Sequence, residues 1–223
     1  MSGQARTRRG WTQNPEAVRE DILSAAISEF AAHGLSGARV DRIAARTETS
    51  KRMIYYYFGD KLGLYSAALE TAYAEVRHGE ETLDLDRLSP MAALERLVAF
   101  TFDHHRSNPD FIRMVMIENI HNAAHLSNSE VIRDLNTTAI DRIAELCRRG
   151  AEDGTMRPDV DPVALHWQIS ALSFFNVSNE PTFSALFGEA FFSDDMQIAR
   201  RRMVVEAVML SVGALRPAAP GPS

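Results

Sequence analysis

The stretch ETSKRMIYYYFGDK, residues 48–61, combines three consecutive tyrosines and a phenylalanine with a Ser-Lys-Arg start. A buried helix rarely carries so many hydroxyls, and a solvated helix rarely carries so many rings. Ile54 and Phe58 are one helical turn apart, so one face of a short helix can pack inward. The other face then presents Lys51, Arg52 and tyrosines to a partner that accepts both rings and cations.

Apolar residues at helical spacing continue on both sides of this stretch. Caps and breakers then mark where each helix begins and ends. The predicted elements are a helix from Pro15 to His33 capped by Asn14 and ended by Gly34, a short helix at Val40–Ala44, a third capped by Thr49 or Ser50, and a fourth capped by Asp60.

The pattern of apolar residues predicts helices in the rest of the chain as well. Further helices are expected at about 90–105, 111–124, 128–152, 161–177 and 194–215, with a Phe-rich link around Pro181 between the last two. No stretch alternates apolar and polar residues over the length of a strand. The sequence therefore predicts an all-α fold of about nine helices, divided into an arm (1–14), a first domain (15–60), a second domain (61–215) and a disordered tail (216–223).

Composition narrows the class of protein. A single cysteine, Cys147, excludes a disulfide framework and a cysteine-based zinc site. No apolar run reaches the length of a membrane span or a signal segment, so we expect a cytoplasmic protein with no membrane contact.

Charge is distributed unevenly along the chain. Residues 1–61 hold ten lysines and arginines against seven acidic residues, a net charge of +3. Because the whole chain has a net charge of −6, the other 162 residues have a net charge of −9. A basic N-terminal part on an acidic remainder suits a polyanion bound at one end. Arg6, Arg8 and Arg9 belong to the predicted arm, for which a solvated tail is favoured over a minor-groove contact.

Two short helices joined by a tight turn, with cations and tyrosines on the open side, are typical of a helix-turn-helix DNA reader. A tyrosine ring can pack on sugars and thymine methyl groups while its hydroxyl reaches phosphates or base edges. Filling a small hydrophobic core is the alternative role, and it is most plausible for Tyr57.

The segment GARVDRIAARTETSKRMIYYYFGDKLGLYSAAL, residues 37–69, resembles the DNA-binding signature of the TetR family of bacterial transcriptional regulators. ILSAAISEFAAHGLSGARV, residues 22–40, is similar to the family's first helix and its Phe-Ala-x-x-Gly ending. The resemblance implies a three-helix DNA-binding domain with a larger helical domain that binds an effector and dimerises. By position in the motif, the implied DNA-binding residues are Arg39, Ser50, Lys51, Arg52, Tyr55, Tyr56, Tyr57 and Lys61.

Three positions depart from the family pattern. The turn reads Thr47-Glu48-Thr49-Ser50 where Ala-Gly-Val-Ser is usual, so a carboxylate replaces a glycine. Arg39 stands where a threonine cap is common, and Arg52 replaces another frequent glycine. These changes affect the turn geometry and the DNA sequence that is read.

The segment FIRMVMIENIHNAAHL, residues 111–126, places polar groups on an apolar helix, as a ligand pocket requires. His121 and His125 would share a helix face with Glu118, but a third metal ligand is missing, so neither a metal, a cofactor nor a catalytic residue is predicted. The candidate effector-binding residues are Phe102, Arg113, Ile117, Glu118, His121, His125, His166, Trp167, Phe174 and Asn176.

Together these features predict a homodimeric repressor that leaves a palindromic operator when it binds a small organic effector, for instance an aromatic acid. The apolar segments 161–177 and 194–215 are the predicted dimer contacts, and the protein would lie at the nucleoid when bound to DNA. Two alternatives remain open: a helical enzyme or metal-dependent protein that uses the His-rich segment 104–125, and a DNA-binding dimer without an effector.

Overall fold

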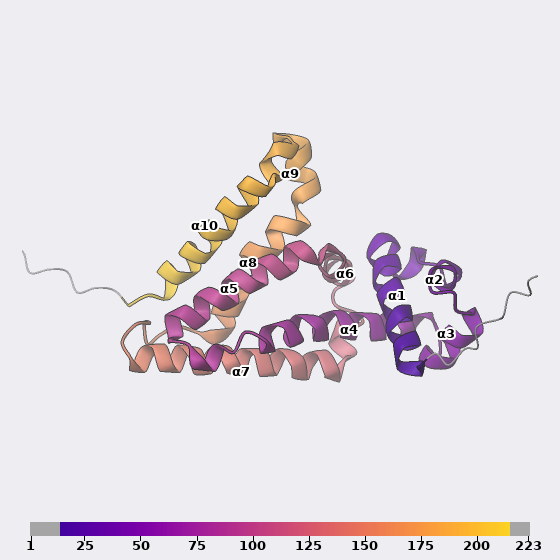
Figure 1. Cartoon of the computed structure of the whole chain (residues 1–223), viewed down its shortest axis with the longest axis horizontal. Coiled ribbons are helices and arrows are strands. Elements are labelled where there is room, and N and C mark those ends of the chain that lie inside the picture. The colour runs from indigo at the N-terminus through magenta and orange to yellow at the C-terminus, as the bar shows by residue number, and fades with distance from the viewer. Residues whose placement is uncertain (1–13, 215–223) are drawn as a thin grey trace, which may run out of the picture. The chain divides into compact units, whose positions relative to one another are not determined.

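The computed structural model describes residues 14–214, which form ten α-helices and three short 3-10 helices with no β-strand in that range (Figure 1). This confirms the predicted all-α class. The expected arm, apart from Asn14, and the expected tail lie outside the described residues. The chain divides into two compact units after Ala68, inside helix α4 (Lys61–Glu81). We call residues 14–68 the head and residues 69–214 the body.

The head contains α1 (Pro15–Gly37), α2 (Val40–Arg46), α3 (Lys51–Phe58) and the start of α4. The expected caps are present, because the side-chain oxygens of Asn14, Ser50 and Asp60 accept backbone N–H groups at 3.2, 3.2 and 2.7 Å. Gly34 has a φ of 64° and kinks α1 one turn before its end. The caps that the sequence predicted for α1, α3 and α4 are therefore confirmed.

The core of the head is small and mainly aliphatic, with one pair of aromatic rings. Ile22, Phe30, Ile43, Ile54 and Tyr65 are fully buried. The Phe30 and Tyr65 rings meet edge to face with centroids 5.0 Å apart, which orients α4 against α1. Ile54 is the buried residue of α3, and Tyr57 and Phe58 are half-buried. The other residues of this helix are exposed.

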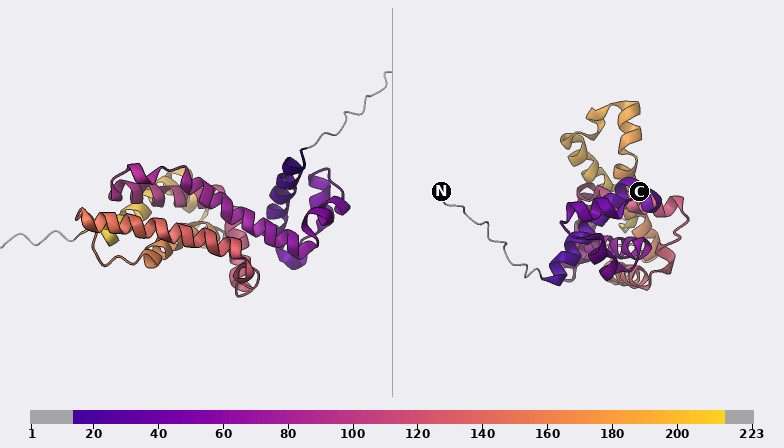
Figure 2. Two further views of the ribbon diagram at one scale, coloured as in Figure 1. Left: turned by 90° about the horizontal axis from the view of Figure 1, so that it is seen from below. Right: turned by 90° about the vertical axis from the view of Figure 1, so that its right-hand side faces the viewer.

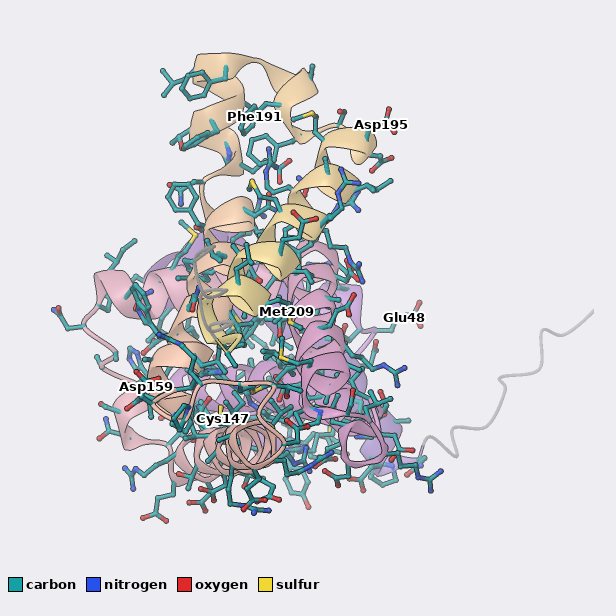
Figure 3. The ribbon with its side chains drawn as sticks, turned by 90° about the vertical axis from the view of Figure 1, so that its left-hand side faces the viewer. Glu48, Cys147, Asp159, Phe191, Asp195 and Met209 are labelled. Atoms are coloured by element: carbon teal, nitrogen blue, oxygen red, sulfur yellow. The ribbon has the colours of Figure 1, made fainter. Side chains whose placement is uncertain are left out.

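The turn between α2 and α3 has a left-handed residue at Glu48, with φ at 51°. This is the position where the resemblance implies a glycine, and only glycine adopts this conformation without steric cost. The Thr47 and Thr49 hydroxyls donate to the carbonyls of Ile43 and Thr47, both at 3.1 Å, and hold the turn closed. Figure 3 shows the Glu48 side chain pointing away from the ribbon.

Substituting Glu48→Gly is expected to raise local stability by up to about 1 kcal/mol, since relief of the left-handed strain exceeds the entropic cost of glycine. Slower amide hydrogen exchange of α2 and α3 in the full chain would report the gain. Ala45→Gly, at an exposed helical position of α2, is the matched control and should cost about 1 kcal/mol. Faster exchange in both variants would show that Glu48 carries no strain.

The body has a core between α5 (Pro90–Ser107), α7 (Glu130–Glu152), α8 (Pro162–Ser178) and α10 (Asp194–Val212). Leu94, Val98, Leu146, Ile169 and Val208 are among its buried residues. Figures 1 and 2 show the second half of α4 and α7 side by side, and two side-chain contacts join them: Arg77 to Asn136 at 3.0 Å and Arg142 to Glu81 at 3.2 Å. The two other helices of the body after α4 are α6 (Pro109–Ile120) and α9 (Glu180–Phe187).

The predicted helix 111–124 is wrong at its C-terminal end, because α6 stops at Ile120. The buried Glu118 carboxylate turns back and accepts the N–H groups of His125 and Leu126 at 3.1 and 3.0 Å. This competes with helical continuation, and Asn122 and Ala123 both take a φ of 56°. His121 and His125 therefore do not share a helix face.

The link predicted around Pro181 is also wrong, since it contains α9 and a 3-10 helix, Glu189–Phe192. Pro181 lies in the first turn of α9, where its missing N–H costs nothing. Phe183, Phe187 and Phe191 pack ring against ring, with Phe183 5.3 Å from Phe187 and 5.9 Å from Phe191. Figure 3 shows Phe191 at the corner where α9 leads into α10.

None of the helices within residues 14–214 combines the length and the apolar character needed to cross a membrane.

Candidate DNA-binding surface and effector cavity

The exposed side of α3 carries the side chains that the sequence assigned to DNA. Tyr56 is 78% exposed and Tyr55 40% exposed, whereas Ile54, on the opposite side of α3, is 0% exposed and belongs to the core of the head. Lys51 and Arg52 are also exposed, at the N-terminal end of the same helix. The structure thus brings two cations and two uncovered rings together on one helix face.

Tyr57 and Phe58 form the boundary between this face and the core. The Tyr57 ring meets Tyr56 edge to face at 5.5 Å and Phe58 at 6.1 Å, and it is half-buried. The Arg19 guanidinium lies 5.5 Å from the centre of the Phe58 ring. Tyr57 therefore supports Tyr56 from the side and keeps part of its own surface accessible.

Lys51 is held by an acidic residue of α2. Its Nζ lies 2.7 Å from Asp41 Oδ1, and Arg39 Nη2 lies 3.7 Å from Asp41 Oδ2. The hydrogen bond from Lys51 lowers the pKa of Asp41, and the same bond raises the pKa of Lys51. Asp41 thus joins two of the predicted DNA-binding cations, and its carboxylate is ionised at neutral pH.

The other predicted DNA-binding residues also make contacts within the head. Lys61 Nζ donates to the Ser36 carbonyl at 3.2 Å, and the Ser50 hydroxyl is engaged as the cap of α3. The backbone N–H of Arg39 donates to the buried Glu29 carboxylate at 3.0 Å, which fixes the start of α2 although Arg39 provides no side-chain cap. Arg39 keeps its guanidinium exposed as a result.

The body contains a cavity of about 400 Å³ between the end of α4, the following 3-10 helix (Leu85–Arg87), α5, α7 and α8. A space of this volume suits a small organic molecule. Its apolar lining residues are Leu85, Leu97, Ala139, Ile143, Leu146 and Ile169. Its charged lining residues are the carboxylates Glu80, Glu81, Asp84, Asp86, Asp141 and Glu145 and the two arginines Arg142 and Arg149.

Uncharged polar groups complete the wall. Burial, followed by the charge of Arg77, lowers the pKa of His166, so this lining imidazole is neutral at pH 7. The same two influences lower the pKa of His104, and burial lowers that of His105 to about 3. The α5–α8 side of the body therefore contains neutral histidines, which add no positive charge to the cavity.

Of the ten residues that the sequence suggested for the effector, His166 lines this cavity. Glu118 and His125 instead bind each other, with 2.9 Å between Oε1 and Nδ1. Asn176 is buried and donates to Gln197 at 3.0 Å while it accepts from Arg200 at 2.8 Å. These three residues stabilise a turn and a helix pair.

The remaining six lie outside the cavity lining as well. Phe102 is part of the body core, and Ile117 and Phe174 are half-buried. Arg113 is exposed and lies 3.8 Å from Asp110, while His121 is exposed beyond the end of α6. Trp167 is 72% exposed on α8, one residue after the lining His166. Within residues 14–214, no group of three His, Cys, Asp or Glu side chains is arranged to hold a metal ion.

The cavity residues that sequence reasoning missed come mainly from two segments. The acidic run EETLDLD, residues 80–86, has the composition of a polar connection between helices. The polar lining residues of α7 have the composition of a solvent-exposed helix face. The signal that was available is the spacing of Thr138, Asp141, Arg142 and Glu145, which form a polar stripe of α7 directly beside its apolar stripe. Only the packing of α4 beside α7 shows that this side faces a hollow.

Comparison with known proteins supports the architecture along most of the chain. Residues 22–68 match the family model "Bacterial regulatory proteins, tetR family", and residues 90–208 match "Tetracyclin repressor-like, C-terminal domain". The HTH-type transcriptional repressor NicS of Pseudomonas putida is 34% identical over 173 residues, covering 78% of this chain and 82% of that protein. The HTH-type transcriptional regulator RutR of Escherichia coli (strain K12) is 26% identical over 86% of this chain and 91% of its own length.

Solved structures agree with this assignment. A transcriptional regulator from Streptomyces coelicolor is 28% identical and superposes with a TM-score of 0.67 over 87% of this chain and 98% of its own. The fatty acid degradation regulator FadR of Bacillus halodurans shares the fold, with a TM-score of 0.67 over 89% of this chain and 97% of its own at 18% identity. With a helix-turn-helix head, a matching C-terminal domain and regulators as relatives, the chain belongs to the TetR family of bacterial transcriptional regulators and is not an enzyme.

Proposed function

We propose that the protein is a homodimeric repressor that binds a two-fold symmetric operator through α3 and leaves it when a small organic molecule fills the body cavity. The observation that carries the DNA-binding part is the exposed face of α3, where Tyr55 and Tyr56 stand beside Lys51 and Arg52. Arg39, Ser50, Tyr57 and Lys61 are the further proposed contacts, at the ends of α2, α3 and α4.

The symmetry of the operator follows from the proposed dimer. Two copies related by a two-fold axis present two α3 helices, and adjacent major grooves on one side of the duplex are about 34–36 Å apart. Footprinting on the DNA upstream of the protein's own gene tests this, with two protected half-sites one helical turn apart as the expected result. Protection of a single half-site, or none, would contradict the proposal.

The dimer contact is proposed on α8 and α10, where large apolar side chains are uncovered. Trp167 is 72% exposed on α8, and Ile198 and Leu210 are 66% and 83% exposed on α10. Surfaces of this kind mark protein–protein contacts. The wild-type protein is expected to sediment as a dimer at micromolar concentration.

Trp167→Glu is expected to shift that dimer to a monomer, because it places a charge on the proposed apolar contact surface. Sedimentation velocity measures the shift, and circular dichroism confirms that the variant is folded. Glu180→Ala, at the exposed start of α9, is the control and should leave the dimer intact. A dimer that survives Trp167→Glu would move the contact away from α8.

Asp41 is expected to limit the affinity of the head for DNA of any sequence, because it competes with phosphates for Lys51 and Arg39. Asp41→Asn should therefore tighten non-specific binding, steepen its salt dependence by about one released counterion, and lower the ratio of operator to non-specific affinity. Titration of labelled operator and scrambled duplexes at several salt concentrations measures all three.

Asp21→Asn provides the matched control for Asp41→Asn, since it makes the same change of charge at an exposed position of α1. It should leave the salt slope nearly unchanged. Equal effects of the two substitutions would mean that only the net charge of the head matters, and that the contact between Asp41 and Lys51 has no separate role.

A further inference from the structure

The chemistry of the cavity wall indicates what kind of molecule fits it. Three of the six lining carboxylates are paired with arginines that lie outside the lining: Glu80 with Arg77, Asp84 with Arg87, and Glu145 with Arg148. Glu81 pairs with the lining residue Arg142 at 3.2 Å. Asp86 and Asp141 have no ion-pair partner among residues 14–214, and neither has the lining cation Arg149. Six lining carboxylates therefore stand against five arginines, which leaves an excess of one negative charge at the cavity.

Each arginine and threonine of the wall already donates a hydrogen bond to a protein acceptor. Arg142 is bound to Glu81, and Arg149 Nη2 donates to the Leu88 carbonyl at 2.5 Å. The Thr101 and Thr138 hydroxyls donate to the carbonyls of Leu97 and Asp134, at 2.9 and 3.0 Å. Their oxygens are left as acceptors, and a ligand would therefore meet many acceptors and few free donors.

The inner part of the cavity has a different character. Leu97, Ile143, Leu146 and Ile169 provide an apolar floor beside the neutral imidazole of His166. An inorganic ion gains nothing from such a surface, whereas a hydrocarbon ring or chain does. The apolar floor and the acidic wall together favour a ligand that has both an apolar body and a positive charge.

We propose that the cavity binds an organic cation, an amine or amidine that donates hydrogen bonds to Asp86 and Asp141 and places an aromatic or aliphatic body against the floor. This rests on the proposed function in one respect, that the occupant of the cavity is the effector. It reverses the charge of the aromatic acid suggested by the sequence, because a carboxylate would meet two unpaired carboxylates, while the lining arginines already bind Glu81 and the Leu88 carbonyl.

Three probes of nearly equal shape test the inference: 2-naphthylmethylamine, 2-naphthylmethanol and 2-naphthoate. Titration calorimetry of the full chain at pH 7 is expected to give the tightest binding for the amine, weaker binding for the alcohol and the weakest for the acid. The affinity of the amine should also fall as the salt concentration rises. Tighter binding of the acid than of the amine, or no binding of the amine, overturns the proposal.

Variants then connect the preference to the named carboxylates. Asp86→Asn and Asp141→Asn should each weaken the amine roughly two- to fivefold, the scale of one partly exposed ion pair, and leave the alcohol unchanged. Asp195→Asn, on the exposed start of α10 and outside the lining, should change neither (Figure 3). Equal loss for amine and alcohol would show a structural effect and overturn the assignment of charge.

Operator release is measured separately, by adding the amine to the protein–DNA complex. Binding of the amine without release would count against the cavity as the effector site in the proposed function. The preference of the cavity for a cation would still be supported by the calorimetry. The two experiments therefore distinguish a failure of the cation proposal from a failure of the proposed function.

Discussion

Tyr56→Ala is expected to weaken operator binding by about 1–3 kcal/mol, roughly 5- to 150-fold, while the chain stays fully folded. The Tyr56 ring is 78% exposed and contacts the Tyr57 ring at 5.5 Å, so it contributes little to the core of the head. A large uncovered ring held by a neighbouring ring is pre-organised for a partner, and its removal costs binding rather than stability. Fluorescence anisotropy with a labelled operator measures the affinity, and thermal unfolding measures the stability.

Tyr56→Phe separates the two roles of this side chain. It keeps the ring, so packing on sugars or thymine methyl groups is preserved, and it removes the hydroxyl that would reach a phosphate. Near wild-type affinity would assign the contribution to the ring, and a loss equal to that of Tyr56→Ala would assign it to the hydroxyl. An unchanged affinity in both folded variants would remove Tyr56 from the DNA contact.

Gly63→Ala is expected to destabilise the head by about 1–3 kcal/mol, the range for forcing an extra methyl group into a packed site. A Cβ at Gly63 would overlap the carbonyl oxygen of Phe58, the last residue of α3. That obstacle is backbone and cannot rotate away, so α3 and the start of α4 must separate. Because the Gly63 N–H also donates to Asp60 at 2.7 Å, the shift would weaken the cap of α4.

Hydrogen exchange of the head amides in the full chain measures this loss, and operator affinity should fall with it because α3 is displaced. Gly37→Ala is the matched control, since its Cβ would meet only His33 Cβ at an ordinary 3.4 Å. This control should be neutral or slightly stabilising, as alanine restricts the unfolded chain. Equal protection in Gly63→Ala and Gly37→Ala would show that the α3–α4 joint tolerates the extra methyl group.

The outcome at Glu48 and at residues 118–126 shows where sequence patterns stop being informative. The residue type at position 48 argues against a left-handed conformation, yet the turn between α2 and α3 imposes a φ of 51°. Apolar periodicity through residue 124 argues for continued helix, yet the buried Glu118 carboxylate needs donors and finds them in the N–H groups of His125 and Leu126. In both cases a tertiary requirement overrides a local preference.

The sequence by itself determined the all-α class, the caps of α1, α3 and α4, and the exposed face of α3. These properties depend on residues within one or two helical turns of each other, so spacing and side-chain chemistry are sufficient. Tertiary structure alone decided which residues line the cavity, because residues 80–86 and the polar side of α7 meet only when α4 packs beside it. The charge of that cavity is a sum over segments more than fifty residues apart, and no local pattern contains it.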